Sequence, residues 1–393
     1  MADMTTKGIR TPLTIGIELI DDPNWMGGTL YLRNLALCLS RLPKAERPTI
    51  RLLGAPAAVA TFVAEYPGVF SPGAAYAQGS WHRWLCKFGL GRTLVDSGID
   101  VLYPGFGSAV SGGTTVRWIP DFQHRYLPHL FSSQEIAARD HSIGAIAEKA
   151  GIVVLSSEVA ADDFRRFFPS HVATPRVWHF RSLLDLSGDL EEDVLDVRRA
   201  HNLPEKYLYL PNQFWVHKNH ITVLRALALL REREGLEIPL VCTGAQSDRR
   251  NAAHFESLQF FMRESGIESQ VRLLGLIPRR EQIAVLRGAA AVVQPSLFEG
   301  WSTVVEDVRA CGRPIFLSDI PVHREQAPPR ATYFSSENSE QLANLLCSTW
   351  QSLMPGPDLS AELDAHEKLE YLILASARTF LQIASEARSL GSN

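Results

Sequence analysis

The 393-residue sequence is poor in cysteine, and its cysteines form none of the close pairs that typically bind metal. There is no Cys-x-x-Cys pair, and no cysteine stands at ligand spacing from a histidine. An odd number of dispersed cysteines in a long chain indicates a reducing compartment and argues against a structural zinc site. The five are Cys38, Cys86, Cys242, Cys311 and Cys347.

Long apolar runs are missing as well. No run approaches the roughly 18 residues that a membrane span needs, and Met1 to Arg10 contains no apolar core of signal-peptide length. We therefore expect a cytoplasmic protein. This expectation is compatible with peripheral contact at the inner face of the membrane.

Positive charge is not in excess. The formal net charge is −4, whereas a protein that mainly neutralises nucleic-acid phosphates would be basic overall. We therefore expect no nucleic-acid partner.

The sequence is instead rich in short apolar runs that alternate with longer amphipathic segments, and its length suits two domains of roughly 150–200 residues each. Such alternation predicts parallel sheets with helices on both faces, an α/β fold. Strands are predicted at residues 13–20, 50–53, 101–103, 116–119, 152–155, 177–180, 207–210, 239–243, 271–273, 291–293 and 315–317, and helices in the second half at 220–233, 252–265, 280–287 and 303–311.

The acidic segment Asp189–Asp193 marks the expected boundary between the two domains, because a charge run of this kind typically forms a solvated helix or linker. We place the first domain at residues 1–185 and the second at 186–359. Residues 360–393 have the pattern of one long helix with no strand after it.

The segment from Gln294 to Ile315 contains the strongest functional signal. A strand ends, a Pro-Ser turn follows, and Glu299-Gly300 precedes a helix that starts near Ser302. Free N–H groups at Ser302, Thr303 and Val304 and the positive end of the helix dipole would bind an anion, and Gly300 would let a ligand approach the backbone. Glu306 would face the same ligand one to two turns on. The structural alternative is that Ser302 only caps the helix and both glutamates are ordinary residues at a helix end.

The run from Phe298 to Ile315, with the following Ser318–His323, resembles the signature of glycosyltransferase family 4. Members are retaining enzymes of the GT-B fold, in which two Rossmann-like, doubly wound parallel-sheet domains face a central cleft, and they use nucleotide-sugar donors. The resemblance implies that Glu299 contacts the donor sugar, that Glu306 binds the ribose, and that Trp301 belongs to the donor site. The family commonly has seven residues between these glutamates, and here there are six.

A second segment, Tyr207–His220, agrees with this resemblance. Members of the family have an Arg and a Lys five residues apart in this loop, and both reach the donor diphosphate. Lys218 matches the lysine, whereas the arginine position is occupied by Gln213. We expect Gln213 and the preceding Asn212 to contact the donor as well. His217 and His220 look like a metal pair, but no third ligand is near, and we interpret them as packing or ligand-polar residues.

Two loops of the first half complete the expected site. Gly27 and Gly28 open a helix after the first strand, where backbone amides could meet a phosphate, although a Gly-x-Gly-x-x-Gly fingerprint is absent. By resemblance, His124 hydrogen-bonds the donor sugar; the alternative is a surface histidine beside a capping Asp121. The segment Gly275–Arg279, which includes Ile277, resembles the loop that lies against the nucleobase.

Trp81–Phe88 mixes aromatic and basic residues. A half-buried amphipathic helix has this pattern, and so does an interfacial membrane element, which would suit a lipid-linked acceptor.

Together these features predict a hexosyltransferase-type, retaining glycosyltransferase with Glu299, His124 and Lys218 as its catalytic residues. By resemblance it would be mannosyltransferase-like, with a nucleotide-sugar donor and a carbohydrate or lipid-linked glycan acceptor, in cell-surface polysaccharide synthesis. No Asp-x-Asp-like ligand set is evident in the sequence, so we expect no cofactor and a metal-independent reaction. Two alternatives remain open: a sugar-nucleotide hydrolase or epimerase with Glu299 and His124 as an acid–base pair, and a non-catalytic nucleotide-sugar-binding chain.

Overall fold

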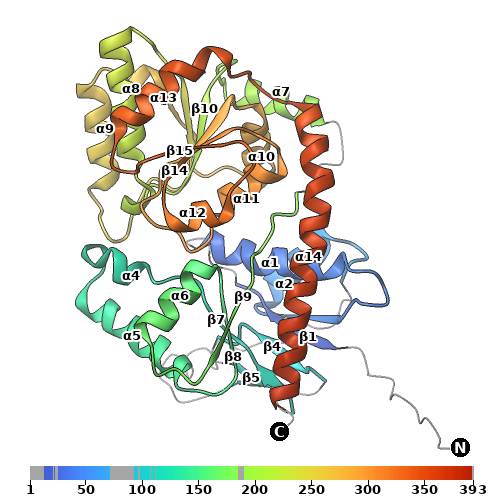
Figure 1. The fold of residues 1–393 in the computed structure, drawn as a ribbon. Helices are drawn as coiled ribbons and strands as arrows, with labels where there is room; N and C mark the ends of the chain where they lie inside the picture. The colour runs from blue at the N-terminus through green and yellow to red at the C-terminus, as the bar shows by residue number, and fades with distance from the viewer. Residues whose placement is uncertain are drawn as a thin grey trace, which may run out of the picture.

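The computed structural model (Figure 1) describes residues 13–70, 93–95, 98–184 and 190–391, apart from residues 21, 23, 24, 107 and 111. The Trp81–Phe88 segment and the predicted domain boundary at residues 185–186 lie outside the described residues. All strand pairings in the described part are parallel, as the alternating pattern predicts.

The first half forms a sheet whose middle strand is shared by two ladders. Strand β6 pairs with β4, and after Val116 the same segment continues as β7 and pairs with β8. Since the amide of Val116 donates to the carbonyl of Leu102 (2.9 Å), the two ladders join without a break in the hydrogen bonding. The four-stranded ladder has the order β2 (Thr49–Leu53), β1 (Thr14–Glu18), β4 (Val101–Tyr103) and β6 (Thr114–Thr115). The three-stranded ladder has the order β7 (Arg117–Ile119), β8 (Ile152–Leu155) and β9 (Thr174–Val177), and β3 (Thr93–Val95) and β5 (Ser108–Val110) form a separate pair.

The helices of the first half are mostly short. They are α1 (Met26–Ser40), α2 (Pro56–Glu65), α4 (Gln123–Tyr126), α5 (Ser133–Ala147) and α6 (Glu158–Phe167), with a 3₁₀ turn at Pro128–Leu130.

The second half forms a six-stranded sheet with the doubly wound order. Numbered within the domain, the strands lie in the order 3-2-1-4-5-6, and the direction of winding reverses between the first and fourth strands. In space the order is β12 (Val271–Leu273), β11 (Leu240–Thr243), β10 (Leu208–Pro211), β13 (Ala291–Gln294), β14 (Ile315–Ser318) and β15 (Ala331–Phe334).

Helices cover both faces of this sheet (Figure 1). Successive residues of β10 belong to different cores, because Leu208 and Leu210 pack on one face while Tyr209 packs on the other. Such a strand is apolar throughout, which is why the short runs could be recognised in the sequence. The helices are α7 (Leu190–Ala200), α8 (His220–Glu234), α9 (His254–Glu264), α10 (Arg279–Gly288), α11 (Thr303–Ala310), α12 (Pro321–Gln326) and α13 (Ser339–Thr349), with 3₁₀ turns at Val216–Lys218, Glu268–Gln270 and Trp350–Ser352.

One predicted strand is wrong over most of its length. Strand β9 ends at Val177, and the next residues leave the sheet. The indole N–H of Trp178 donates to the carbonyl of Ser376 (3.0 Å), and the Ser376 hydroxyl donates to the carbonyl of His179 (2.8 Å). These apolar residues therefore pack against the C-terminal helix instead of extending the sheet.

The C-terminal helix α14 (Leu359–Gly391) contacts both halves of the chain (Figure 1, red). Near its start Glu362 forms a buried ion pair with Arg287 of α10 (2.8 Å). Further along, Leu369, Ile373 and Phe380 belong to the core of the first half. Among the described helices, none is both long and apolar enough to cross a lipid bilayer.

Candidate active site

The candidate site lies at the carboxyl edge of the second sheet, where the strand order reverses between β10 and β13. Ligands of open α/β sheets bind at such a switch point. The loop after β10 carries Lys218 and the loop after β13 carries Glu299. The Nζ atom of Lys218 lies 2.6 Å from Oε1 of Glu299, and Nε2 of Gln294 donates to the same oxygen (2.9 Å). The structure thus brings together two of the three predicted catalytic residues.

The charge on Glu299 is fixed by its neighbours. Its side chain is 9% exposed, and burial, the largest single effect, would raise its pKa. The charge and hydrogen bond of Lys218, together with His217 and His323, outweigh burial and lower the pKa of Glu299 to about 2. Burial lowers the pKa of His217 to about 3 and that of His323 to about 4. At neutral pH the site therefore contains one carboxylate, one ammonium and neutral imidazoles.

The two histidines that flank Lys218 differ in their surroundings. His220 is stacked on Phe214, with ring centroids 4.2 Å apart, and belongs to the packing of α8. His217 is 5% exposed, and its Nδ1 has no hydrogen-bond partner. Within the described part of the chain, no three His, Cys, Asp or Glu side chains are grouped to hold a metal ion.

The side chains of Asn212 and Gln213 form hydrogen bonds between the ends of neighbouring strands. Nδ2 of Asn212 donates to Oε1 of Gln294 (2.8 Å), which joins the ends of β10 and β13. Oε1 of Gln213 accepts a hydrogen bond from the amide of Ala245 (2.6 Å), which joins the ends of β10 and β11. Their predicted contacts with a donor remain predictions.

The start of α11 differs from the predicted anion site in one respect. Ser302 stands at the N-cap position, but its side chain does not cap the helix; its Oγ accepts from Nε2 of Gln294 (3.3 Å). The amide of Ser302 is not free either, because it donates to Oε1 of Gln326 (3.0 Å). The amides of Thr303 and Val304 lie in the first turn, where the helix itself offers no acceptor.

The Glu306 carboxylate is held by partners other than those of Glu299. Its side chain is fully buried, and Arg181 (3.0 Å) and Arg309 (3.4 Å) lie within ion-pair distance of its carboxylate. Nε2 of Gln326 donates to the same carboxylate (3.1 Å). The Glu306 oxygens thus have protein partners in this structure, and the expected contact with the ligand of Glu299 stays a prediction.

The next residue, Asp307, was missed by the sequence reasoning. Seven residues separate it from Glu299, so the interval that the resemblance calls for could have drawn attention to it. Both of its oxygens accept from Arg279 at the start of α10 (2.8 and 2.5 Å), and Oδ1 also accepts from the Ser182 hydroxyl (2.5 Å). Asp307 thus holds the loop that was predicted to lie against the nucleobase.

Gly300 is required by a neighbouring loop of the protein itself. A Cβ atom at Gly300 would overlap the carbonyl oxygen of Pro120 and lie 3.0 Å from Cβ of Asp121. The Tyr126 and Phe298 rings, 5.4 Å apart, continue this contact. The reason expected for this glycine, close approach of a ligand, is therefore corrected: the backbone of the first-domain loop occupies that side.

His124 stands on this first-domain loop. It is fully buried; its Nε2 lies 2.9 Å from Oδ1 of Asp140, and its Nδ1 has no hydrogen-bond partner. Asp140 also pairs with Arg125 (2.9 Å), and Asp121 accepts from the amide of Gln123 at the start of α4 (2.9 Å). The surface-histidine alternative is therefore wrong, and the predicted contact of His124 with the donor sugar stays a prediction.

The remaining residues that were predicted to contact the donor lie in different environments. Gly27 faces open space, whereas Gly28 is covered by the Trp25 ring. Trp301 is stacked on His179 (4.3 Å), and its indole N–H donates to the carbonyl of Phe180 (3.2 Å), so it packs against the segment between the domains. Ile277 is partly buried against the core of the second domain.

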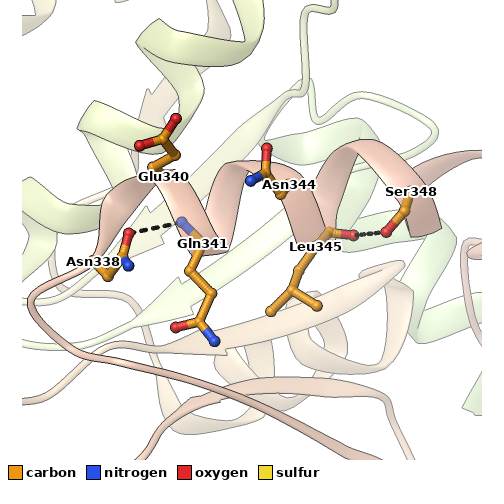
Figure 2. A pocket seen from close by; sticks show the side chains of 6 residues that line it. All are labelled: Asn338, Glu340, Gln341, Asn344, Leu345 and Ser348. Carbon is orange, nitrogen blue, oxygen red and sulfur yellow. Dashed lines mark hydrogen bonds between the residues drawn. The ribbon is translucent and has the colours of Figure 1, made fainter.

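A surface depression on α13 lies apart from these residues (Figure 2). It contains none of the predicted site residues and is lined by Asn338, Glu340, Gln341, Asn344, Leu345 and Ser348.

Comparison with known proteins relates the second half of the chain to glycosyltransferases. Residues 193–349 match the family model of group 1 glycosyl transferases. A D-inositol 3-phosphate glycosyltransferase from Corynebacterium jeikeium is 34% identical over 95 residues, which is 24% of this chain and 22% of that protein.

The solved structures extend the likeness to nearly the whole chain. Sucrose-phosphate synthase from Thermosynechococcus elongatus superimposes with a TM-score of 0.63 at 17% identity, over 96% of this chain and 99% of the other. The Anabaena protein HepE in complex with UDP-glucose gives a TM-score of 0.66 at 14% identity, over 94% and 99%. The chain has the GT-B fold with two Rossmann-like domains. Identities this low carry the fold and nothing further.

Proposed function

We propose that this chain is a retaining glycosyltransferase of the family 4 type, which moves a hexosyl group from a nucleotide sugar to a carbohydrate or lipid-linked glycan. The Lys218–Glu299 pair at the switch point carries the proposal, because it lies inside the segment that matches the group 1 model. The Anabaena structure with UDP-glucose and the Corynebacterium glycosyltransferase support a nucleotide-sugar donor.

In the proposed reaction the bond between the anomeric carbon and the diphosphate breaks as the acceptor oxygen bonds to the same carbon face. The acceptor proton passes to the departing phosphate oxygen. Negative charge grows on the diphosphate, where Lys218 and the amides of Thr303 and Val304 would stabilise it. The Glu299 carboxylate, ionised because its pKa is about 2, would stabilise the positive anomeric carbon. The proposal includes no cofactor and no metal.

His124 would act from the opposite domain. One ring nitrogen is held by Asp140, so the ring orientation is fixed, and the unpartnered Nδ1 would bind a sugar hydroxyl. The contact of Gly300 with Pro120 brings the loop of His124 against the loop of Glu299. Because the two domains meet at this point, the reacting sugar would be shielded from water.

The hydrolase or epimerase alternative requires Glu299 to exchange a proton near neutral pH. A carboxyl group with a pKa of about 2 is a poor proton donor there, and its contact with Lys218 keeps it ionised. The geometry therefore favours transfer over acid–base chemistry.

We further propose a cytoplasmic role in cell-surface polysaccharide synthesis. One of the structures with the same fold, WaaG, is a glycosyltransferase involved in lipopolysaccharide biosynthesis (TM-score 0.57, 12% identity, covering 94% of this chain and 99% of the other).

Thermal-shift measurements with nucleoside diphosphates and nucleotide sugars test the proposal first, because a ligand that binds the folded state raises the melting temperature. Glu299→Ala and Lys218→Ala should then each slow sugar transfer at least tenfold, about 1.4 kcal/mol. The exposed residues Glu256 and Lys44 provide matched controls as E256A and K44A. Wild-type rates in both site variants would refute the assignment.

A further inference from the structure

The charge at the proposed donor site is balanced before any ligand arrives. Lys218 contributes one positive charge and Glu299 one negative charge 2.6 Å away, while His217 and His323 are neutral at pH 7. A nucleoside diphosphate adds at least two negative charges. Binding it in this half-buried place calls for a cation that Glu299 does not neutralise.

The arginines nearest to α11 already have carboxylate partners. Arg181 pairs with Glu306, and Arg279 pairs with Asp307. Gln213, which takes the place of a cation in the loop after β10, is neutral and anchors the neighbouring loop through Ala245.

That neighbouring loop, residues 244–251, runs alongside the loop of Lys218. A Cβ atom at Gly244 would overlap the carbonyl oxygen of Asn212, and the amide of Val216 donates to Oδ2 of Asp248 (3.0 Å). The loop therefore carries Arg250, one of its two arginines, to the same edge of the sheet.

The guanidinium group of Arg250 lies where the two domains meet. It lies over the Trp215 ring (5.8 Å) and the Phe131 ring (5.0 Å), and its Nη1 donates to Oε1 of Gln123 (3.2 Å). Gln123 directly precedes His124. Arg250 has one carboxylate partner, Asp248, but that ion pair is long (3.6 Å), and the Asp248 carboxylate also accepts from two backbone amides.

Two observations indicate that this place serves a ligand. The Arg250 side chain is 22% exposed, so its charge is accessible between the two rings that hold it. His217, which is almost fully buried, has an unpartnered Nδ1, and Arg250 lies close enough to help lower its pKa. Arg250 and His217 thus lie beside the same Trp215 ring, whose centroid is 5.6 Å from that of the His217 ring, and Lys218 directly follows His217 in the chain.

We propose that Arg250 is the second cation of the donor site and binds the diphosphate together with Lys218. This proposal rests on the proposed function. Arg250, in the loop after β11, would supply the positive charge that Gln213 does not supply in the loop after β10. A guanidinium group suits this task, because its planar N–H groups bind two phosphate oxygens at once.

The test compares the affinity of wild type and variants for the nucleoside diphosphate that gives the largest thermal shift, and for the corresponding nucleoside without phosphates. We expect R250Q to weaken diphosphate binding at least tenfold and to leave nucleoside binding unchanged. The neighbouring exposed Arg249 provides the control R249Q, which should bind both ligands like wild type. Restoring the charge on the adjacent loop, in the double variant Q213R/R250Q, should recover diphosphate affinity.

The outcomes separate the two proposals. Wild-type diphosphate affinity in R250Q would overturn the assignment and leave Arg250 as a contact between domains. An equal loss of nucleoside and diphosphate affinity would also overturn it, because the loop itself would then have been disturbed. If the wild-type protein binds no nucleoside diphosphate, the proposed function fails and this inference fails with it.

Discussion

Lys218→Met is the most informative single change, because it removes the ammonium group and keeps most of the apolar side chain. Glu299 would then be a carboxylate that is 9% exposed and retains only Gln294 as a hydrogen-bond donor from a side chain. Breaking a buried ion pair by removing one partner typically costs about 3–5 kcal/mol.

The pKa of Glu299 gives an independent magnitude. It is about 2 in the folded protein against an ordinary value of 4.5, and a difference of one pKa unit corresponds to about 1.4 kcal/mol. The ionised state of Glu299 therefore contributes on the order of 3 kcal/mol at neutral pH. Since this contribution is present above pH 4.5 and is lost as the pH falls toward 2, it is fully expressed in an experiment at pH 7.

Urea unfolding at pH 7, followed by tryptophan fluorescence and circular dichroism, measures the loss. K218M should lower the free energy of unfolding by about 3 kcal/mol, whereas the double variant K218M/E299Q should recover at least 1 kcal/mol of that loss, because no buried charge remains. The double variant should nevertheless transfer sugar at least tenfold more slowly than wild type.

The pH dependence of K218M provides a sharper check. Without the ammonium, burial raises the pKa of Glu299 above its ordinary value, so the carboxyl group takes up a proton more readily. The stability difference between wild type and K218M should therefore shrink as the pH falls from 7 to 5. Two results together would refute the reasoning. The effects of K218M and E299Q on the free energy of unfolding would add within about 0.5 kcal/mol, and the stability difference between wild type and K218M would stay constant from pH 7 to 5.

Three further expectations follow from other parts of the site. Because the pKa values of His217 and His323 are lowered in the folded protein, the unfolded chain takes up protons that the folded protein does not. Stability should therefore fall as the pH drops below 6.5, by on the order of 1 kcal/mol per histidine at pH 5.5. Melting temperatures across this pH range measure the loss. Gly300→Ala should destabilise the protein by about 1–3 kcal/mol, because the alanine Cβ atom would overlap the backbone of the first-domain loop. Urea unfolding would measure the loss of stability, and unchanged stability would argue against that contact. Glu306→Gln should leave Arg181 without a full negative partner and reduce stability by about 2 kcal/mol or more. The KM for the donor should change less than threefold. A large rise in KM at unchanged stability would instead support the predicted ribose role.

The sheets were predictable because their signal is local. A strand buried on both faces is apolar at every residue, as β8 (Ile152–Leu155) and β4 (Val101–Tyr103) show, and both were predicted at their observed bounds. The site loops followed from the same pattern. The carboxyl ends of adjacent parallel strands lie at one edge of a sheet, which brought Lys218 and Glu299 together as predicted.

The environment of α11 was not predictable in this way. Successive helical residues point about 100° apart, so a shift of one position decides whether Glu306 or Asp307 faces a given neighbour. The partners that settle the matter, Arg181 and Ser182, lie 125 residues earlier in the chain. Without an alignment, a single sequence gives no signal for such a long-range ion pair.

The signature after β13 therefore serves two tasks. Glu299 faces the proposed donor, whereas Trp301, Glu306 and Asp307 bind Phe180, Arg181 and Ser182, three consecutive residues of the segment between the domains. We therefore expect a substitution at any of these three positions to disturb the contact between the second domain and the segment that joins the domains. A loss of activity on substitution of Trp301, Glu306 or Asp307 indicates a ligand contact only if stability is unchanged. At Glu299, by contrast, the partner Lys218 lies in the same domain. The double-variant cycle there separates effects on folding from effects on the reaction.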